Sequence, residues 1–272
     1  MISRFLITFC LSIFLNSGFS QLPYASNGRT EMVNGKNIYY EETGSGTPLL
    51  LMHGFNRTAE DWKPYVKDLS RNYRVIAVDL PGHGRSDVLD SGNAYHHSLA
   101  SLHLAKFVKQ IQLDSFHIMG FSSGGISALY MAAFNKLPVK KMIIIAAQVK
   151  FSDSTRSFIG SLGSSNNFVT DSIEMSQLHG PEKGMRLARQ FYDFRLPSND
   201  PDITPDRLGS IQAETLVIHG ALDPAAPVGN AWIMGRYIPR VSLWIWPDAD
   251  HISIFFPEHK EVFMKGVREF LR

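Results

Sequence analysis

The sequence of 272 residues has one cysteine, Cys10, and little excess charge of either sign. A single cysteine excludes a disulfide framework within the chain. Lys and Arg number 27 and Asp and Glu 25, a formal net charge of +2, and the basic residues form no stripe along the sequence. The charge pattern therefore gives no support to a nucleic-acid partner. After the first twenty residues no stretch holds 18 consecutive apolar residues, which excludes stable membrane insertion of a processed chain.

What is present is the composition of a globular protein. The chain is 44% hydrophobic, 11% aromatic and 19% charged, which is too apolar for intrinsic disorder. At this length a chain buries roughly three-quarters of its unfolded surface, so it needs neither disulfides nor a metal in order to fold.

Residues 1–20 have the three parts of a secretory signal. One positive charge comes first, then an apolar run over residues 5–15, then small and polar residues before Gln21. This order predicts cleavage before Gln21 and a secreted or periplasmic protein. An uncleaved anchor is the alternative, but this run of eleven residues is short for a membrane span. Because Cys10 lies inside the signal, the processed chain has no cysteine nucleophile.

The rest of the chain alternates short apolar runs with amphipathic stretches. Residues 30–43 read as a hairpin around the turn dipeptide Asn34-Gly35. Six further runs are too short for helices and are typical of strands buried on both faces: 49–52, 75–78, 116–119, 142–145, 216–218 and 241–245. Helical periodicity follows in stretches that include 99–113, 125–137 and 259–271. This alternation predicts an α/β fold whose mostly parallel sheet has helices on both faces and binds ligands at the carboxyl ends of its strands.

Residues 151–209 interrupt the alternation, because they contain no strong strand run. Unstructured loops of this length are uncommon in compact domains. We therefore expect a cap of short helices inserted between two parts of one core, residues 21–150 and 210–272.

The motif Gly120-Phe121-Ser122-Ser123-Gly124 follows a predicted strand and opens a predicted helix. This context is typical of a nucleophile elbow, a sharp turn in which small residues must stand two before and two after the nucleophile. Gly120 and Gly124 meet that requirement for Ser122. If Ser123 were the nucleophile, the bulky Phe121 would stand where a small residue is needed.

A serine hydroxyl needs a base that removes its proton, and in proteins with this elbow the chain order is serine, acid, histidine. Asp223 lies just past a predicted strand, and His251 lies past the next one. They are the predicted acid and base. The alternatives are a turn aspartate and a surface histidine. Four other histidines fit worse, because they lie within predicted strands, in the cap or at a helix start: His117, His219, His179 and His259.

The oxyanion that forms during acyl transfer needs two preorganised N–H donors. We expect one from the backbone of Ser123 and the other from Phe55, in the loop after the strand 49–52. His53 is interpreted as a structural residue of that loop. From their position beside the predicted triad, Phe121 and Ile252 are expected to line the substrate pocket, together with apolar cap residues.

From about Thr30 to Arg272 the chain resembles the α/β-hydrolase superfamily. The resemblance rests on these pieces: His53-Gly54-Phe55 with Trp62, Asp79-Leu80-Pro81-Gly82-His83-Gly84-Arg85-Ser86, the elbow, Gly220-x-x-Asp223-x-x-x-Pro227, and His251. It implies an eight-stranded sheet, a helical cap between strands six and seven, and hydrolysis without a cofactor. One departure is Asp250, where a small residue is usual before the histidine; its charge would raise the histidine pKa.

Ser122 argues against epoxide hydrolases and haloalkane dehalogenases, which resemble this chain elsewhere but use aspartate at the elbow. A serine nucleophile suits acyl transfer, so hydrolysis of a small carboxylic ester is the first hypothesis. Lactone, thioester or C–C bond cleavage, perhydrolysis, a peptidase and a non-catalytic ligand-binding relative remain alternatives. No metal-ligand cluster and no cofactor motif is present in the sequence, and the oligomeric state is not determined by it.

Overall fold

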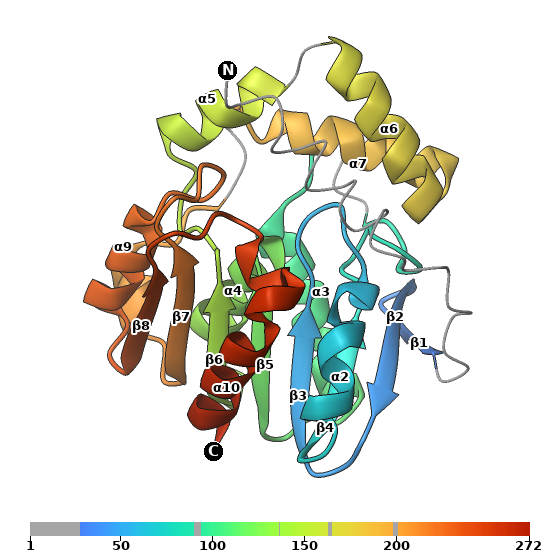
Figure 1. Cartoon of the computed structure of the whole chain (residues 1–272). Coiled ribbons are helices and arrows are strands. Elements are labelled where there is room, and N and C mark those ends of the chain that lie inside the picture. The colour runs from blue at the N-terminus through green and yellow to red at the C-terminus, as the bar shows by residue number, and fades with distance from the viewer. Residues whose placement is uncertain (1–27, 90–93, 136, 163–164, 198–200) are drawn as a thin grey trace.

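A computed structural model describes residues 28–89, 94–135, 137–162, 165–197 and 201–272. The predicted signal, residues 1–20, lies outside these ranges. The described chain forms one eight-stranded sheet in the order β1-β2-β4-β3-β5-β6-β7-β8 (Figure 1). Its strands are β1 (Gly28–Val33), β2 (Lys36–Thr43), β3 (Thr47–Met52), β4 (Tyr73–Val78), β5 (Phe116–Phe121), β6 (Val139–Ile145), β7 (Glu214–Gly220) and β8 (Val241–Trp246).

Antiparallel pairing is confined to one edge of the sheet. β1 pairs with β2 through the predicted turn, where Asn34 and Gly35 have φ angles of 49° and 75°. β2 is also antiparallel to β4. The pairs β3–β4, β3–β5, β5–β6, β6–β7 and β7–β8 are all parallel. The carboxyl ends of these parallel strands therefore meet along one edge.

Each face of the sheet carries its own hydrophobic cluster, because successive strand residues point to opposite faces. On one face Leu50 and Met52 pack among residues of α3 (His97–Gln110), α4 (Ser123–Phe134), α8 (Pro205–Gly209) and α9 (Gly229–Tyr237). On the other, Leu49 and Leu51 pack among residues of α2 (Lys63–Leu69) and α10 (Lys260–Leu271). The structure thus has the predicted α/β architecture with a covered, mostly parallel sheet. Three one-turn 3₁₀ helices are also present: η1 (Ala59–Trp62), η2 (Ser253–Phe255) and η3 (Pro257–His259).

The insertion between β6 and β7 contains three helices that lie above the carboxyl ends of the strands: α5 (Asp153–Leu162), α6 (Ser165–His179) and α7 (Pro181–Asp193) (Figure 1). α8 follows within the expected cap range 151–209, but it contacts α4 and α9 of the core. The chain has already returned to the core by Asp202, which forms a β-bridge with Lys150. The helices over the site therefore end before α8, because Leu208 of α8 is buried in the core cluster.

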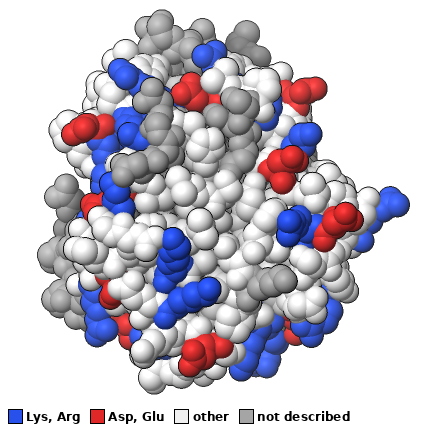
Figure 2. All heavy atoms as spheres, turned by 180° about the vertical axis from the view of Figure 1, so that it is seen from behind, with Lys and Arg blue, Asp and Glu red and all other residues white. Residues whose placement is uncertain are grey.

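The surface shows no concentration of one charge on the face seen in Figure 2, where basic and acidic side chains lie scattered among uncharged ones. Within the described ranges, no helix is both long enough and apolar enough to span a bilayer.

Candidate active site

Ser122 stands at the turn between β5 and α4, with φ 49° and ψ −117°. A non-glycine residue in this region is strained, and such strain persists where the surrounding structure fixes it. The backbone segments around this turn approach each other closely. A Cβ at Gly120 would lie 2.5 Å from the carbonyl oxygen of Gly124, and a Cβ at Gly124 would lie 2.3 Å from the carbonyl oxygen of Met52. The two glycines therefore allow the turn that presents the Ser122 side chain at the tip of the strand.

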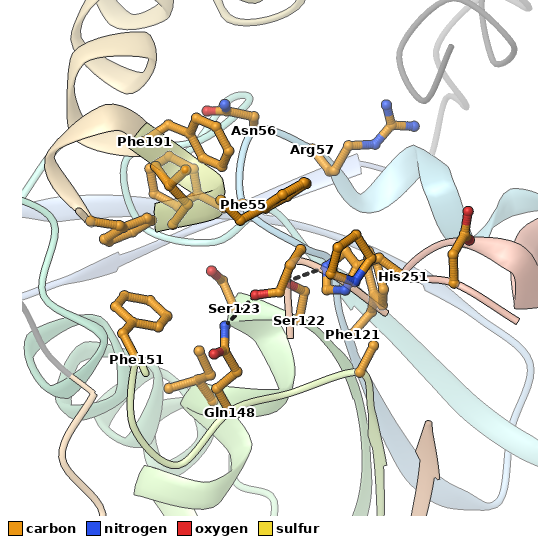
Figure 3. Close-up of a pocket in the computed structure, with 18 of the residues that line it drawn as sticks. Phe55, Asn56, Arg57, Phe121, Ser122, Ser123, Gln148, Phe151, Phe191 and His251 are labelled. Atoms are coloured by element: carbon orange, nitrogen blue, oxygen red, sulfur yellow. Dashed lines mark hydrogen bonds between the residues drawn. The ribbon is translucent and has the colours of Figure 1, made fainter. Parts of the chain in front are cut away.

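The structure brings Ser122, His251 and Asp223 together from three separate loops. His251 Nε2 lies 3.1 Å from Ser122 Oγ, and His251 Nδ1 lies 2.7 Å from Asp223 Oδ2. The other carboxylate oxygen of Asp223 accepts the backbone N–H groups of Ala225 at 2.9 Å and Ala226 at 2.7 Å. These bonds fix the buried carboxylate, which in turn orients the imidazole. Figure 3 shows the His251 ring pointing toward Ser122.

Two opposing effects act on the pKa of His251. Burial lowers it, whereas the charge of Asp223, its hydrogen bond and the charge of Asp250 raise it, and the net pKa lies above the ordinary value of 6.5. Asp250 does not bond the ring: its Oδ1 accepts the Ser253 hydroxyl at 2.7 Å and the Ile252 N–H at 3.1 Å. The arrangement therefore makes His251 a stronger base than a free histidine.

The two residues predicted to supply the oxyanion donors, Ser123 and Phe55, come from two different parts of the chain. Ser123 is the first residue of α4, and Phe55 follows β3; both line the same cavity as Ser122. The β3 loop can approach the elbow because residue 54 is glycine, since a Cβ there would lie 2.8 Å from the Phe121 ring. Both residues thus lie at the cavity that the half-buried Ser122 also lines, and their role as oxyanion donors stays a prediction.

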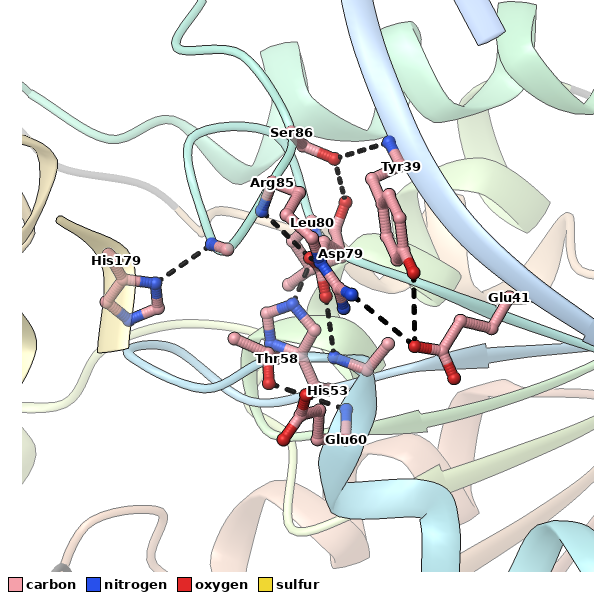
Figure 4. A network of polar contacts seen from close by, with 12 residues as sticks. Tyr39, Glu41, His53, Thr58, Glu60, Asp79, Leu80, Arg85, Ser86 and His179 are labelled. Carbon is pink, nitrogen blue, oxygen red and sulfur yellow. Dashed lines mark hydrogen bonds and ion pairs between the residues drawn. The ribbon is translucent and has the colours of Figure 1, made fainter. Parts of the chain in front are cut away.

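A buried polar network holds the β3 loop in this position (Figure 4). His53 Nε2 accepts the Leu80 N–H at 2.8 Å, so its Nδ1 carries the proton and donates to the Gly54 carbonyl at 2.7 Å. Asp79 Oδ1 accepts the N–H of Ala59 at 2.8 Å, and its Oδ2 binds Arg85 Nε at 3.0 Å. His53 thus fixes the loop through both ring nitrogens.

The site opens into a cavity of about 190 Å³ between the sheet and the helices above it. Its lining is mostly apolar: Phe55, Phe121, Ile126, Ala146, Phe151, Phe158, Ile159, Met175, Phe191, Phe194, Pro224 and Ala225. The polar lining residues, besides Ser122 and His251, are Asn56, Arg57, Ser123, Gln148, Asp171 and Asp250. Most of the wall is thus aromatic or aliphatic.

Phe121 lies in the cavity wall as expected, but Ile252 does not line the cavity. The chain turns at Asp250 into η2, and Ile252 packs instead against the hydrophobic cluster of the α2–α10 face. The expectation for Ile252 is therefore corrected: proximity to His251 in the sequence did not determine the direction of its side chain.

Two polar residues of the site region carry no local sequence signal. Gln148 donates from Nε2 to the Ala225 carbonyl at 3.1 Å and accepts the Thr155 hydroxyl at 2.8 Å, which ties α5 to the turn of Asp223. His97 at the start of α3 has Nε2 2.9 Å from Ser123 Oγ. Only a pattern that links residues far apart in the sequence would have found them.

Three or more His, Cys, Asp or Glu side chains positioned for a metal ion do not occur together anywhere in the described ranges.

The sequence is similar to known proteins of one fold family. A family model described as alpha/beta hydrolase fold matches residues 47–191, more than half of the chain. The pimeloyl-[acyl-carrier protein] methyl ester esterase of Legionella pneumophila (strain Corby) is 25% identical over 251 residues, 87% of this chain and 100% of that enzyme. The non-heme haloperoxidase of Rhodococcus erythropolis is 27% identical over 250 residues, 80% of this chain and 90% of that protein.

Among solved structures, an esterase from Thermogutta terrifontis has a TM-score of 0.71 at 22% identity and covers 90% of this chain and 98% of its own; this likeness concerns the fold alone. The extent of the family match, the sheet order and the elbow agree: the chain belongs to the α/β hydrolase fold family.

Proposed function

We propose that the chain is a serine esterase that hydrolyses small carboxylic esters through an acyl-enzyme. Ser122 attacks the ester carbonyl while His251 takes its proton. Asp223 holds the imidazole and balances the imidazolium charge, and the backbone N–H groups of Ser123 and Phe55 bind the oxyanion. His251 then protonates the leaving alcohol, and it activates the water that releases the acid.

The observation that carries this proposal is the continuous hydrogen-bonded path from Ser122 through His251 to Asp223, at 3.1 and 2.7 Å. A ligand-binding protein would need neither a base beside the serine nor a buried carboxylate behind that base. The strained backbone of Ser122 supports the same conclusion, because strain gathers at functional sites.

The cavity favours a small or medium acyl group. Its volume of about 190 Å³ is enclosed mainly by aromatic and aliphatic side chains, which bind an uncharged carbon chain better than a polyanionic one. The name of the Legionella relative, a methyl ester esterase, supports esters as the substrate class.

A phosphonate probe that reacts with activated serines tests the proposal directly. We expect one adduct, located on Ser122 by peptide mass spectrometry, and hydrolysis of p-nitrophenyl butyrate that falls about 10³-fold or more in Ser122→Ala. Ser127→Ala is the matched control, because Ser127 is a fully buried serine of α4, the helix that begins directly after Ser122. An adduct on another serine, or full activity of Ser122→Ala, would remove Ser122 from the mechanism.

We also propose that residues 1–20 direct secretion and are removed. Expression in a host with a secretory pathway, followed by N-terminal sequencing of the exported protein, should give a chain that starts at Gln21 and has no titratable thiol, because Cys10 is lost. A thiol in the exported protein would mean that the segment is retained.

A further inference from the structure

A second histidine lies behind the floor of the cavity. His97 is fully buried at the first position of α3, and its Nε2 lies 2.9 Å from the hydroxyl oxygen of Ser123. Its ring stacks on Phe194 at a centroid distance of 5.4 Å and meets Phe151 edge-on at 6.0 Å. Since both phenylalanines line the cavity, only one layer of side chains separates His97 from a bound substrate.

Ser123 has a side chain whose role the esterase mechanism leaves open, because that mechanism uses only its backbone N–H. In the part of the chain that the structure describes, the bond to His97 is the one hydrogen bond of this hydroxyl. A hydroxyl offers one donor and two acceptor positions, so capacity remains after His97 is satisfied. Ser123 is only 3% exposed, and it lines the cavity beside Ser122 below Phe55 and Phe191 (Figure 3).

An acyl chain without polar atoms would leave this remaining capacity unpaired in an apolar site, which disfavours its binding. An oxygen substituent on the acyl chain would satisfy it. When His97 donates, Ser123 is free to donate to an oxo group; when His97 accepts, Ser123 accepts from a hydroxyl group.

We propose that Ser123, held by His97, selects acyl groups that carry a hydroxyl or oxo oxygen one or two carbons from the scissile carbonyl. The position follows from the cavity: Ser123 directly follows Ser122 in the chain and lines the same cavity, so its hydroxyl is placed to meet a substituent close to the carbonyl that Ser122 attacks. This inference rests on the proposed esterase function and specifies its substrate class. Ser123 is thereby a specificity residue and His97 a positioning residue.

The test measures kcat/KM by pH-stat titration for four ethyl esters, of butanoate, 2-hydroxybutanoate, 3-hydroxybutanoate and 3-oxobutanoate, with both enantiomers of the hydroxy acids. The readout is the ratio of each oxygenated ester to butanoate, in which a change in the oxyanion site cancels. We expect the best ratio to fall about tenfold in Ser123→Ala, the loss of one hydrogen bond.

Two variants of His97 separate positioning from packing. His97→Phe keeps the ring among its aromatic neighbours but removes the bond to Ser123, and its ratio should fall several-fold. His97→Gln places an amide near the position of Nε2, and it should retain most of the wild-type ratio. Equal ratios in the wild type and all three variants would overturn the inference and leave the His97–Ser123 bond as a structural tie between α3 and α4.

Measuring the binding of the product acids tests the Ser123–His97 selectivity separately from the esterase proposal. Isothermal titration of Ser122→Ala with butanoate and 3-hydroxybutanoate should show tighter binding of the hydroxy acid, and Ser122→Ala/His97→Phe should lose that preference. If the wild type hydrolyses none of the four esters, the esterase proposal fails while this preference still supports the polar pair. If the acids bind equally well to Ser122→Ala, the inference fails whatever the turnover.

Discussion

At the scale of single residues, the site is governed by two carboxylates next to one histidine. Asp223 accepts the Nδ1 proton of His251, which leaves the Nε2 lone pair facing Ser122. Asp250 acts on the same ring only through its charge, because its Oδ1 is bonded to Ser253 and to the backbone of Ile252. Asp223 therefore controls which tautomer His251 adopts, whereas Asp250 affects only the basicity of the ring.

Replacement of each carboxylate by its amide should therefore have unequal effects. We expect Asp223→Asn to lower kcat for an activated ester by about 10³- to 10⁴-fold, because the histidine loses both its tautomer and its countercharge. Asp250→Asn should change kcat by less than about tenfold, as expected for one partly exposed charge. Steady-state kinetics on p-nitrophenyl butyrate compares them, and the reverse order would assign the catalytic acid to Asp250.

The pH dependence of the reaction should follow His251. Its imidazole must be neutral to accept the Ser122 proton, so kcat/KM should rise with pH through one ionisation. Burial lowers the pKa of His251, but Asp223 and Asp250 outweigh it, so the midpoint should lie above 6.5. Asp250→Asn should move the midpoint downward; a pH–rate profile whose midpoint is unchanged or higher in this variant would show that Asp250 does not act on the ring.

At the scale of elements, α6 and α7 pack on each other, and hydrogen bonds at their junction hold them to a loop of the core. The residues at their junction bind the loop after β4: His179 Nδ1 accepts the Gly84 N–H at 2.8 Å, and Lys183 Nζ donates to the carbonyls of Gly84 and Ser86 at 2.9 and 2.7 Å. Met175 and Phe191 from these helices reach the cavity. The position of this helix pair therefore sets the upper wall of the substrate site.

Close contact between α6 and α7 requires glycine at position 184. A Cβ there would lie 2.3 Å from the backbone nitrogen of Ser176, so Gly184→Ala should force the helices apart and destabilise the protein by about 1–3 kcal/mol. The preference among acyl chain lengths should change as well. Gly160→Ala on α5 is the control: nothing lies within 4 Å of its added Cβ, and the substitution should be neutral or stabilising.

Thermal unfolding and kcat/KM for p-nitrophenyl acetate, butyrate and octanoate measure both effects. Equal melting temperatures for the two alanine variants would show that the α6–α7 packing tolerates the extra methyl group.

At the scale of the whole molecule, several buried histidines make the folded protein less stable in acid. Burial lowers the pKa of His117 and of His179 to about 4, with Lys141 and Lys140 adding to the effect at His117. Burial likewise lowers the pKa of His53 and that of His219. Between these values and 6.5 the unfolded chain binds more protons than the folded one, so stability falls as pH decreases through this interval. His251, whose pKa is raised, contributes in the opposite sense.

The variant His117→Gln tests this linkage far from the active site, near the start of β5. We expect its unfolding free energy to fall less between pH 7 and pH 4 than that of the wild type, by up to about 3 kcal/mol for a shift of this size. Chemical denaturation in a pH series measures the difference. Comparison at pH 8, where the histidine is neutral in both states, separates lost packing from lost titration, and parallel curves would exclude His117 as a source of the acid sensitivity.

Local sequence patterns were sufficient for the fold class and for the elbow. Short apolar runs of three to five residues predicted six of the strands, because a strand buried on both faces needs no polar position. The turn at Asn34-Gly35 and the two glycines around Ser122 predicted backbone conformations that few other residues adopt. Helix ends were off by a few residues: the predicted 99–113 is α3, His97–Gln110.

The sequence alone thus determined the fold class and the strand–helix order, because each strand and turn has a signal within a few neighbouring positions. It also predicted a cap insertion and a triad of Ser122, Asp223 and His251, three side chains that the structure brings together. Only the tertiary structure decided which side chains share the cavity. In the structure Ile252 packs against a hydrophobic cluster outside the cavity, and α8 packs on the core. His97 contacts Ser123, which lies 26 positions away in the sequence. The physical reason is that such contacts depend on how α3, α4 and the sheet pack together, and periodicity records which face of an element is buried but not which partner it meets.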